Sequence, residues 1–276
     1  MNRLLSANFT RLIKDKIFWL SMIFMSLMSI YMIVMRYITT KQYGYRLYLD
    51  YGFFNYSIYA VIVLSVFVSL FVGTEYSDGA IRNKIIVGHK RSDIYLSNFL
   101  VCTAVGFLIC IAYIVPTLII GIPLVGFFET EIQTILLTGL CVFAMTIAFS
   151  AIFTAISMLN QSKAIAAVIT ILGVFLLLFI GIYIQTRLDE PEVYDGYSYS
   201  VGGEVVSVEE EPNPLYLSGT KRDVYEFLYD FLPGCQSVRL SNMIAPDPLT
   251  MSVYSIGIAT VATGLGLIFF RKKDLK

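Results

Sequence analysis

The side chains that could carry out chemistry are few, and they lie far apart in the sequence. The chain has one histidine, His89, and four cysteines, of which Cys102, Cys110 and Cys141 lie inside apolar runs. A Ser–His pair or a histidine metal site within those runs is therefore ruled out. The sequence also lacks the Gly-x-x-x-x-Gly-Lys-Ser/Thr loop that binds nucleotides and the Gly-x-Ser-x-Gly turn of hydrolases. We expect no catalytic residue, no metal site and no bound cofactor in this chain.

The composition indicates what the chain does instead of catalysis. Hydrophobic residues make up 57% of the 276 residues, charged residues only 14%, and the mean hydropathy is +0.73. Twenty basic and twenty acidic residues leave no net positive charge for a nucleic-acid backbone, so no nucleic-acid partner is expected. Four cysteines are too few for a disulfide-stapled scaffold. The sequence predicts an all-α polytopic membrane protein, in contact with membrane lipid.

Six apolar runs are long enough to cross a bilayer, whose hydrocarbon core of about 30 Å takes roughly 20 helical residues. None of these runs contains Asp, Glu, Lys, Arg or His. The predicted transmembrane helices are residues 17–35, 53–72, 99–121, 132–156, 164–184 and 249–270.

The charges of the connecting segments predict the orientation of these helices. One set of segments is basic, with 13 Lys or Arg and 5 Asp or Glu in residues 1–16, 73–98, 157–163 and 271–276. The other set is acidic, with 7 Lys or Arg and 15 Asp or Glu in residues 36–52, 122–131 and 185–248. The positive-inside rule places the basic side in the cytoplasm, with both termini. Arg36, Lys41 and Arg46, in the first outer loop, run against that rule.

Two segments on the basic side have helical patterns. Residues 1–16 have an apolar and a basic face, which predicts an interfacial elbow helix. In the loop 73–98, Ser77 or Asp78 can cap a short helix that ends near Gly88. Its predicted apolar face is Ile81, Ile85 and Ile86, and its polar residues include Arg82 and Lys84. A helix this short is unstable alone, so this face should pack on the membrane or in a groove of a soluble partner.

The longest loop, residues 185–248, should form a large extracellular α/β subdomain before the last transmembrane helix. Alternating residues at 197–201 and 204–208 around Gly202 and Gly203 predict a β-hairpin. Thr220 and Asp223 form a capping box ahead of a helix that Pro233 and Gly234 should end.

These features together resemble those of ABC-2 type transporter permeases, the membrane subunits of bacterial ATP-binding cassette exporters. The resemblance covers the whole chain, 1–276, as a single permease domain. Its most specific part is the exit of the second transmembrane helix, with Glu75, a short helix ending at Gly88, and Arg91; the basic ending after Phe270 is similar too.

The resemblance implies a six-helix ABC-2 (type V exporter-like) fold in the bacterial plasma membrane. It also implies a non-catalytic subunit that pairs with a second permease copy and with a separate ABC ATP-binding subunit, where ATP and Mg would be bound. The loop helix would then be a coupling helix seated in the ATP-binding subunit, with its Ile81/Ile85 face buried there and Glu75, Gly88 and Arg91 flanking it. The implied translocation path contains Asn55, Tyr59, Ser65, Ser69 and Thr170. Export is the expected direction, and the apolar helices favour a hydrophobic or amphipathic substrate.

Two alternatives stay open from the sequence. One is an autonomous secondary carrier or channel, which the lack of ionisable residues in the transmembrane helices disfavours. The other is a membrane sensor or immunity component that acts through the extracellular loop.

Overall fold

The fold is seen in a computed structural model that describes residues 1–44, 48–50, 52–194, 196–201, 204–243 and 247–274. Among these residues, six helices are long and apolar enough to cross a membrane. They are α2 (Lys16–Tyr43), α3 (Tyr56–Ser77, preceded by the 3₁₀ turn η1, Phe53–Asn55), α5 (Arg91–Val125), α6 (Ile132–Leu159), α7 (Lys163–Leu188) and α10 (Pro248–Lys272). The chain is thus an all-α polytopic membrane protein.

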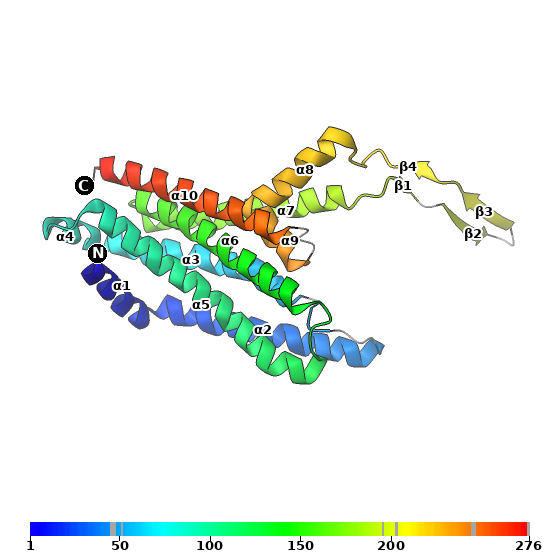
Figure 1. Cartoon of the computed structure of the whole chain (residues 1–276), viewed down its shortest axis with the longest axis horizontal. Coiled ribbons are helices and arrows are strands. Elements are labelled where there is room, and N and C mark those ends of the chain that lie inside the picture. Colours follow the sequence, from blue (N-terminus) through cyan, green and yellow to red (C-terminus); the bar gives the residue numbers. More distant parts are fainter. Residues whose placement is uncertain (45–47, 51, 195, 202–203, 244–246, 275–276) are drawn as a thin grey trace.

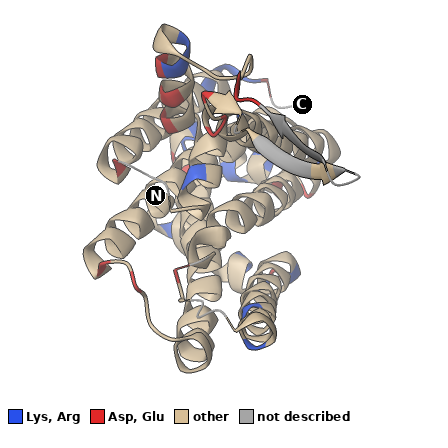
Figure 2. Ribbon diagram, turned by 90° about the vertical axis from the view of Figure 1, so that its right-hand side faces the viewer, with Lys and Arg blue, Asp and Glu red and all other residues tan. Residues whose placement is uncertain are grey.

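The six helices lie side by side along the long axis of the molecule (Figure 1). The described N-terminus, the end of α10 and the short helix α4 (Ala80–Ile86) lie at one end, which we call the terminal end. The opposite end, the hairpin end, carries β1 (Val193–Tyr194), β2 (Tyr197–Val201), β3 (Glu204–Val208) and β4 (Glu211–Pro212). In the view onto the hairpin end, acidic residues mark the loops (Figure 2).

Packing divides the helices into an inner and an outer group. α3 and α6 have the largest share of buried residues, whereas α2, α7 and α10 have the smallest. The main packing partners are α6 with α10, α2 with α5, and α3 with α7. The exposed sides are apolar, with residues such as Leu20, Leu172, Phe179 and Val253 more than 60% exposed, as expected of surfaces that face lipid.

Several helices extend beyond the apolar runs that predicted them. α2 continues to Tyr43, where Gly44 ends it in the left-handed conformation at φ 71°. α5 begins at Arg91 and runs through Pro116 and Pro123 to Val125. Hydropathy marks only the part of a helix that lies in hydrocarbon, so a polar first turn such as that of α5 is not detected by it.

The elbow helix is α1 (Asn2–Lys14), amphipathic with Leu4, Asn8 and Leu12 buried. It is separated from α2 by Asp15, whose carboxylate accepts hydrogen bonds from the amides of Ile17 (2.7 Å) and Phe18 (3.1 Å). Asp15 therefore caps α2 and turns the chain between the two helices.

At the hairpin end, β2 and β3 pair in antiparallel register from Tyr197↔Val208 to Val201↔Glu204, and β1 pairs with β4. The turn predicted at Gly202 and Gly203 lies outside the described residues. α8 (Gly219–Phe231) follows, with Ser218 at its N-cap position and no side-chain cap, so Thr220 does not form the capping box expected of it.

A second helix of the segment before α10, α9 (Pro233–Ser241), is absent from the sequence prediction. Pro233 and Gly234 do end α8, but Pro233 also occupies the first turn of α9, a position that suits proline. All its residues except Arg239 are buried, because α9 packs against α7, α3 and α6. Close approach requires glycine on both sides: a Cβ on Gly234 would lie 2.5 Å from Cβ of Leu177, and one on Gly181 would lie 3.0 Å from Cα of Cys235.

Candidate functional site

The terminal end holds a buried carboxylate that joins four helices. Glu75, in the last turn of α3, is 1% exposed, and its Oε1 accepts from Arg11 of α1 and from Nζ of Lys84 of α4 (2.5 Å). Its Oε2 accepts from Nδ2 of Asn98 of α5 (2.8 Å). We call Asn8, Arg11, Glu75, Lys84 and Asn98 the Glu75 network.

Asn8 closes this network into a ring. Its Nδ2 donates to Oδ1 of Asn98 (3.2 Å), and its Oδ1 accepts from Nζ of Lys84 (3.0 Å). The guanidinium of Arg11 also donates to the backbone oxygen of Phe71 (2.7 Å) and lies 3.7 Å above the centre of the Phe71 ring. A buried ion is tolerated only when it is paired and hydrogen-bonded, and Glu75 has both kinds of partner.

The network holds α4 in place, and this reverses the predicted orientation of the helix. Ile81 is 1% exposed and Ile85 packs against the core of the same chain, so these two residues and Lys84 form the inner face. The prediction that Ile81 and Ile85 are offered to a partner is therefore wrong for this conformation. The outer face consists of Arg82, Asn83, Ile86 and Val87. We call these four residues the outer face of α4. Of its two apolar members, Ile86 is 74% and Val87 77% exposed.

The ends of α4 are set by backbone geometry rather than by side-chain caps. Gly79 is the N-cap residue at φ 68° and no side chain caps the helix, so the predicted cap by Ser77 or Asp78 is wrong. Gly88 ends the helix at φ 95°, as predicted. The amide of Gly88 donates to the oxygen of Ile85 (2.9 Å) and that of His89 to Lys84 (3.1 Å), the bond pattern of a Schellman motif.

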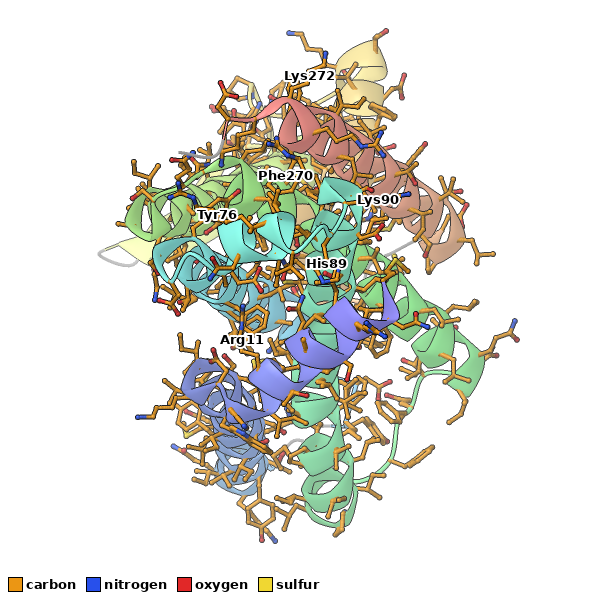
Figure 3. The ribbon with its side chains drawn as sticks, turned by 90° about the vertical axis from the view of Figure 1, so that its left-hand side faces the viewer. Arg11, Tyr76, His89, Lys90, Phe270 and Lys272 are labelled. Carbon is orange, nitrogen blue, oxygen red and sulfur yellow. The ribbon has the colours of Figure 1, made fainter. Side chains whose placement is uncertain are left out.

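Arg91, the second predicted flanking residue, ties the start of α5 to the end of α10. Its Nη1 donates to the oxygens of Phe270 (3.3 Å), Arg271 (2.9 Å) and Lys273 (2.5 Å), carbonyls that a helix C-terminus leaves without partners. A guanidinium here is also favoured by the negative end of the α10 dipole. Figure 3 looks onto this end of the molecule, with Arg11, Tyr76 and Phe270 labelled.

The residues after α10 pack on the same surface. Nζ of Lys273 donates to the Tyr76 hydroxyl and to the oxygen of Met158, both at 3.1 Å, and lies 4.5 Å from the centre of the Tyr76 ring. Burial lowers the pKa of Lys273 to about 8. Tyr76 itself donates to Met158. The end of α3, the end of α6 and the C-terminal segment thus pack together at the terminal end.

The residues expected to line a path do not form one within a single chain. Ser65 and Ser69 are fully buried and donate to backbone oxygens of their own helix, at 2.7 and 3.0 Å. Thr170 is also buried and donates to the oxygen of Ser65 (3.3 Å), which makes it a contact between α3 and α7. Tyr59 is half-buried, with its ring 6.1 Å from that of Tyr113, and Asn55 lines a polar pocket at the hairpin end.

Sequence reasoning missed Asn8, Arg11 and Asn98 as members of a site. Asn98 lies at the polar start of α5, directly before an apolar run, and Asn8 interrupts the apolar face of the elbow helix. A polar residue on the buried face of an amphipathic helix was the available signal.

Fold and site together define a six-helix membrane protein whose terminal end presents a short, ion-anchored helix with an exposed apolar tip. The family model described as ABC-2 family transporter protein matches residues 4–177, from the elbow helix into α7 and including the whole Glu75 network. The chain therefore belongs to the ABC-2 family of transporter proteins and is a multi-pass membrane component of transport. A comparison with curated proteins found no match.

Proposed function

We propose that this chain is the permease subunit of an ATP-binding cassette exporter and that it binds a separate ATP-binding subunit through the outer face of α4. The observation that carries the proposal is the exposure of Ile86 and Val87 on a helix held by the buried Glu75. An exposed apolar tip on a rigid, charged end of a bundle is typical of a protein-binding surface.

The Glu75 network gives this surface a mechanical role. Lys84 attaches α4 to Glu75 at the end of α3, and Arg11 attaches the elbow helix to the same carboxylate. A displacement of α4 is therefore transmitted to α3, α5 and α1 together. ATP binding that closes the partner subunits would bias such a two-state movement and open or close the path.

The remaining parts of the assembly follow from the family. The terminal end faces the cytoplasm of a bacterial cell, ATP and Mg are bound by the partner subunit, and a second permease copy completes the path. The exported substrate is hydrophobic or amphipathic, consistent with helices that carry no charged side chain in their apolar runs.

The test is co-purification of the full chain in mild detergent, with an affinity tag inserted between β2 and β3 so that the terminal end stays unmodified. Ile86→Asp places a charge on the exposed tip, and Leu215→Asp, at a 46% exposed residue of the hairpin end, is the matched control. We expect the unmodified chain and Leu215→Asp to bring down a soluble Walker A protein with ATPase activity, and Ile86→Asp to lose it.

Recovery of that ATPase with Ile86→Asp at the unmodified level would contradict the proposed docking surface. Transport by the purified chain alone in liposomes, without ATP, would contradict the permease function and support a carrier or channel.

A further inference from the structure

Arg36 is a cation of α2 that neither the Glu75 network nor the proposed coupling uses. It follows Trp19 by 17 residues in the same helix, so the two lie about 26 Å apart along its axis, roughly the thickness of the hydrocarbon core. Trp19 lies in the first turn of α2, where interfacial aromatic residues are common, which would place Arg36 at the headgroup level of the opposite leaflet.

The guanidinium of Arg36 has N–H donors that form no hydrogen bond with a described residue. It donates from Nη1 to the oxygen of Leu49 (3.2 Å), and among the described residues no carboxylate forms an ion pair with it. The nearby carboxylate of Asp50 accepts instead from the amides of Glu129 (2.8 Å) and Thr130 (3.0 Å). A half-buried guanidinium with unused donors is suited to a phosphate or carboxylate.

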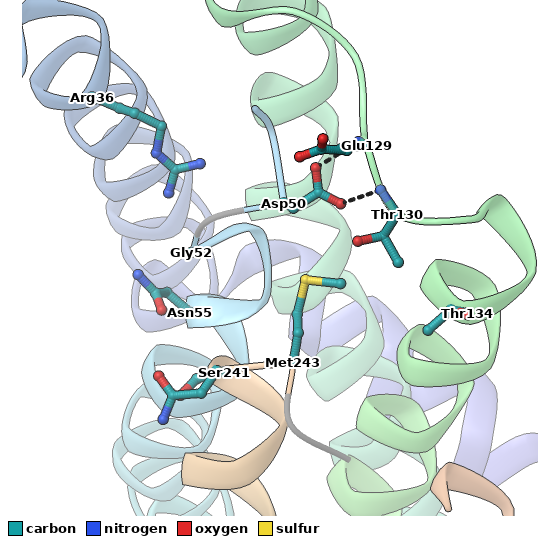
Figure 4. A pocket seen from close by; sticks show the side chains of 10 residues that line it. Arg36, Asp50, Gly52, Asn55, Glu129, Thr130, Thr134, Ser241 and Met243 are labelled. Atoms are coloured by element: carbon teal, nitrogen blue, oxygen red, sulfur yellow. Dashed lines mark hydrogen bonds between the residues drawn. The ribbon is translucent and has the colours of Figure 1, made fainter. Parts of the chain in front are cut away.

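Arg36 lines a polar pocket of about 590 Å³ between α2, the start of α3, the α5–α6 connection and the end of α9 (Figure 4). Its wall includes the carboxylates of Asp50 and Glu129, together with Asn55, Thr130 and Met243. Met243 has φ 57°, the one described non-glycine residue with positive φ, and strained backbone of this kind is concentrated at binding sites.

An apolar groove of about 440 Å³ lies on the other side of the same two segments. Residues 52–56 and 127–136 contribute to both cavities, and the rings of Phe53 and Phe128, 4.9 Å apart and edge to face, line the groove. Phe127, Ile132, Leu136 and Leu140 line the groove and are 49–63% exposed, so the groove opens toward the lipid.

We propose that this pair of cavities is a binding site for a phospholipid of the leaflet at the hairpin end. The phosphate would accept hydrogen bonds from Arg36 in the polar pocket, and an acyl chain would lie in the groove over the Phe53–Phe128 pair. Three observations select a phospholipid over a free anion: the depth of Arg36, the apolar groove beside the polar pocket, and the opening of that groove toward lipid.

Native mass spectrometry of the purified full chain tests the proposal with three probes. Phosphatidylglycerol has both a phosphate headgroup and acyl chains. Diacylglycerol has only the acyl chains, and glycerol 3-phosphate has only the phosphate group. Arg36→Gln removes the charge, and Lys41→Gln, at an exposed position of the same helix outside the pocket, is its control. Gly139→Phe fills the groove, because nothing lies within 4 Å of a Cβ there.

We expect phosphatidylglycerol to bind and Arg36→Gln to weaken its binding about tenfold or more, because the variant loses a charged hydrogen-bond donor to the phosphate. Lys41→Gln should leave binding unchanged. Gly139→Phe should also weaken binding, and it keeps the test valid if Arg36→Gln does not fold. Equal binding of diacylglycerol, displacement of the lipid by equimolar glycerol 3-phosphate, or an equal loss in Lys41→Gln would each overturn the proposal.

Discussion

The buried charges at the two ends of the bundle have different kinds of partner. At the terminal end, one carboxylate, Glu75, accepts from two cations and an amide that lie on three other helices. At the hairpin end, Asp50 accepts from the backbone amides of Glu129 and Thr130, and Arg36 beside it forms no ion pair with a described residue. The first arrangement fixes helices to one another, whereas the second leaves a cation available inside a pocket.

This difference matches the proposed roles of the two ends. An end that transmits movement needs its elements joined, so that α4 cannot shift without α3 and α1. An end that admits a molecule from the membrane needs donors without internal partners. The predictions below test the comparison, beginning with the largest effect.

Glu75→Ala should be the most destabilising single change at the terminal end. Removing one member of a buried ion pair costs about 3–5 kcal/mol because the remaining charges stay buried and unpaired. We expect a clearly lower melting temperature in detergent, measured by fluorescence-detected size-exclusion chromatography. Glu226→Ala, which removes an exposed i,i+4 partner of Arg222, should change it little. Similar melting temperatures for the two variants would mean that Glu75 does not join the helices.

Gly234→Ala should destabilise the hairpin end through packing rather than charge. The new Cβ would lie 2.5 Å from Cβ and 2.6 Å from the oxygen of Leu177, and backbone cannot move aside as a flexible side chain can. Overpacking of this kind costs about 1–3 kcal/mol. Gly257→Ala, in α10 with open space around its Cβ, is the control and should be neutral or slightly stabilising. A neutral result at Gly234 would mean that α9 is not packed tightly against α7.

Asp50→Asn should have a smaller effect, of about 1–2 kcal/mol, because the amide oxygen can replace only one of the two acceptors. Burial raises the pKa of Asp50, but the hydrogen bonds from Glu129 and Thr130 outweigh it and leave the pKa below its usual value. The carboxylate therefore stabilises the loop above the unfolded pKa, and this contribution is lost as the pH falls through the lowered folded value. In melting curves recorded below pH 4, the melting temperature of the wild type should approach that of Asp50→Asn. A difference in melting temperature that stays constant with pH would contradict the stabilising role of the ionised Asp50 carboxylate.

The smallest effect is expected at Lys273, whose pKa burial lowers to about 8. Unfolded chains hold that proton up to a higher pH, so the folded state gains stability as the pH rises above 8 toward the unfolded pKa. Amine labelling followed by mass spectrometry should give Lys273 a reactivity midpoint near pH 8. A midpoint above 10 would show that Lys273 is solvated rather than packed on Tyr76.

The sequence predicted some of these features and not others, for identifiable reasons. The six transmembrane helices follow from long uncharged runs, and the hairpin strands from alternation and paired glycines. The spacing of three isoleucines predicted α4, but periodicity gives the apolar positions of a helix without saying which of them the bundle covers. Lys84 stands between Ile81 and Ile85 on the inner face because Glu75 pairs with it there.

Long-range contacts account for most of what was missed. Asn8 and Asn98 are 90 residues apart in the chain, and no local pattern links them. Only one residue separates α8 from α9. The sequence predicted that Pro233 ends a helix, but it is also the first residue of the next one. Ser65, Ser69 and Thr170 have the polarity of path-lining residues, but the same hydroxyls satisfy their bonding on helix backbones when α3 and α7 pack.

The central claim is that the outer face of α4 seats an ATP-binding subunit, and site-specific photocrosslinking in native membranes tests it most directly. A photoreactive amino acid at Val87, 77% exposed, should crosslink to a soluble protein with a Walker A motif, identified by mass spectrometry. The same probe at Leu215 of the hairpin end should not. No such crosslink from Val87, with full expression and membrane insertion of the chain, would contradict the account.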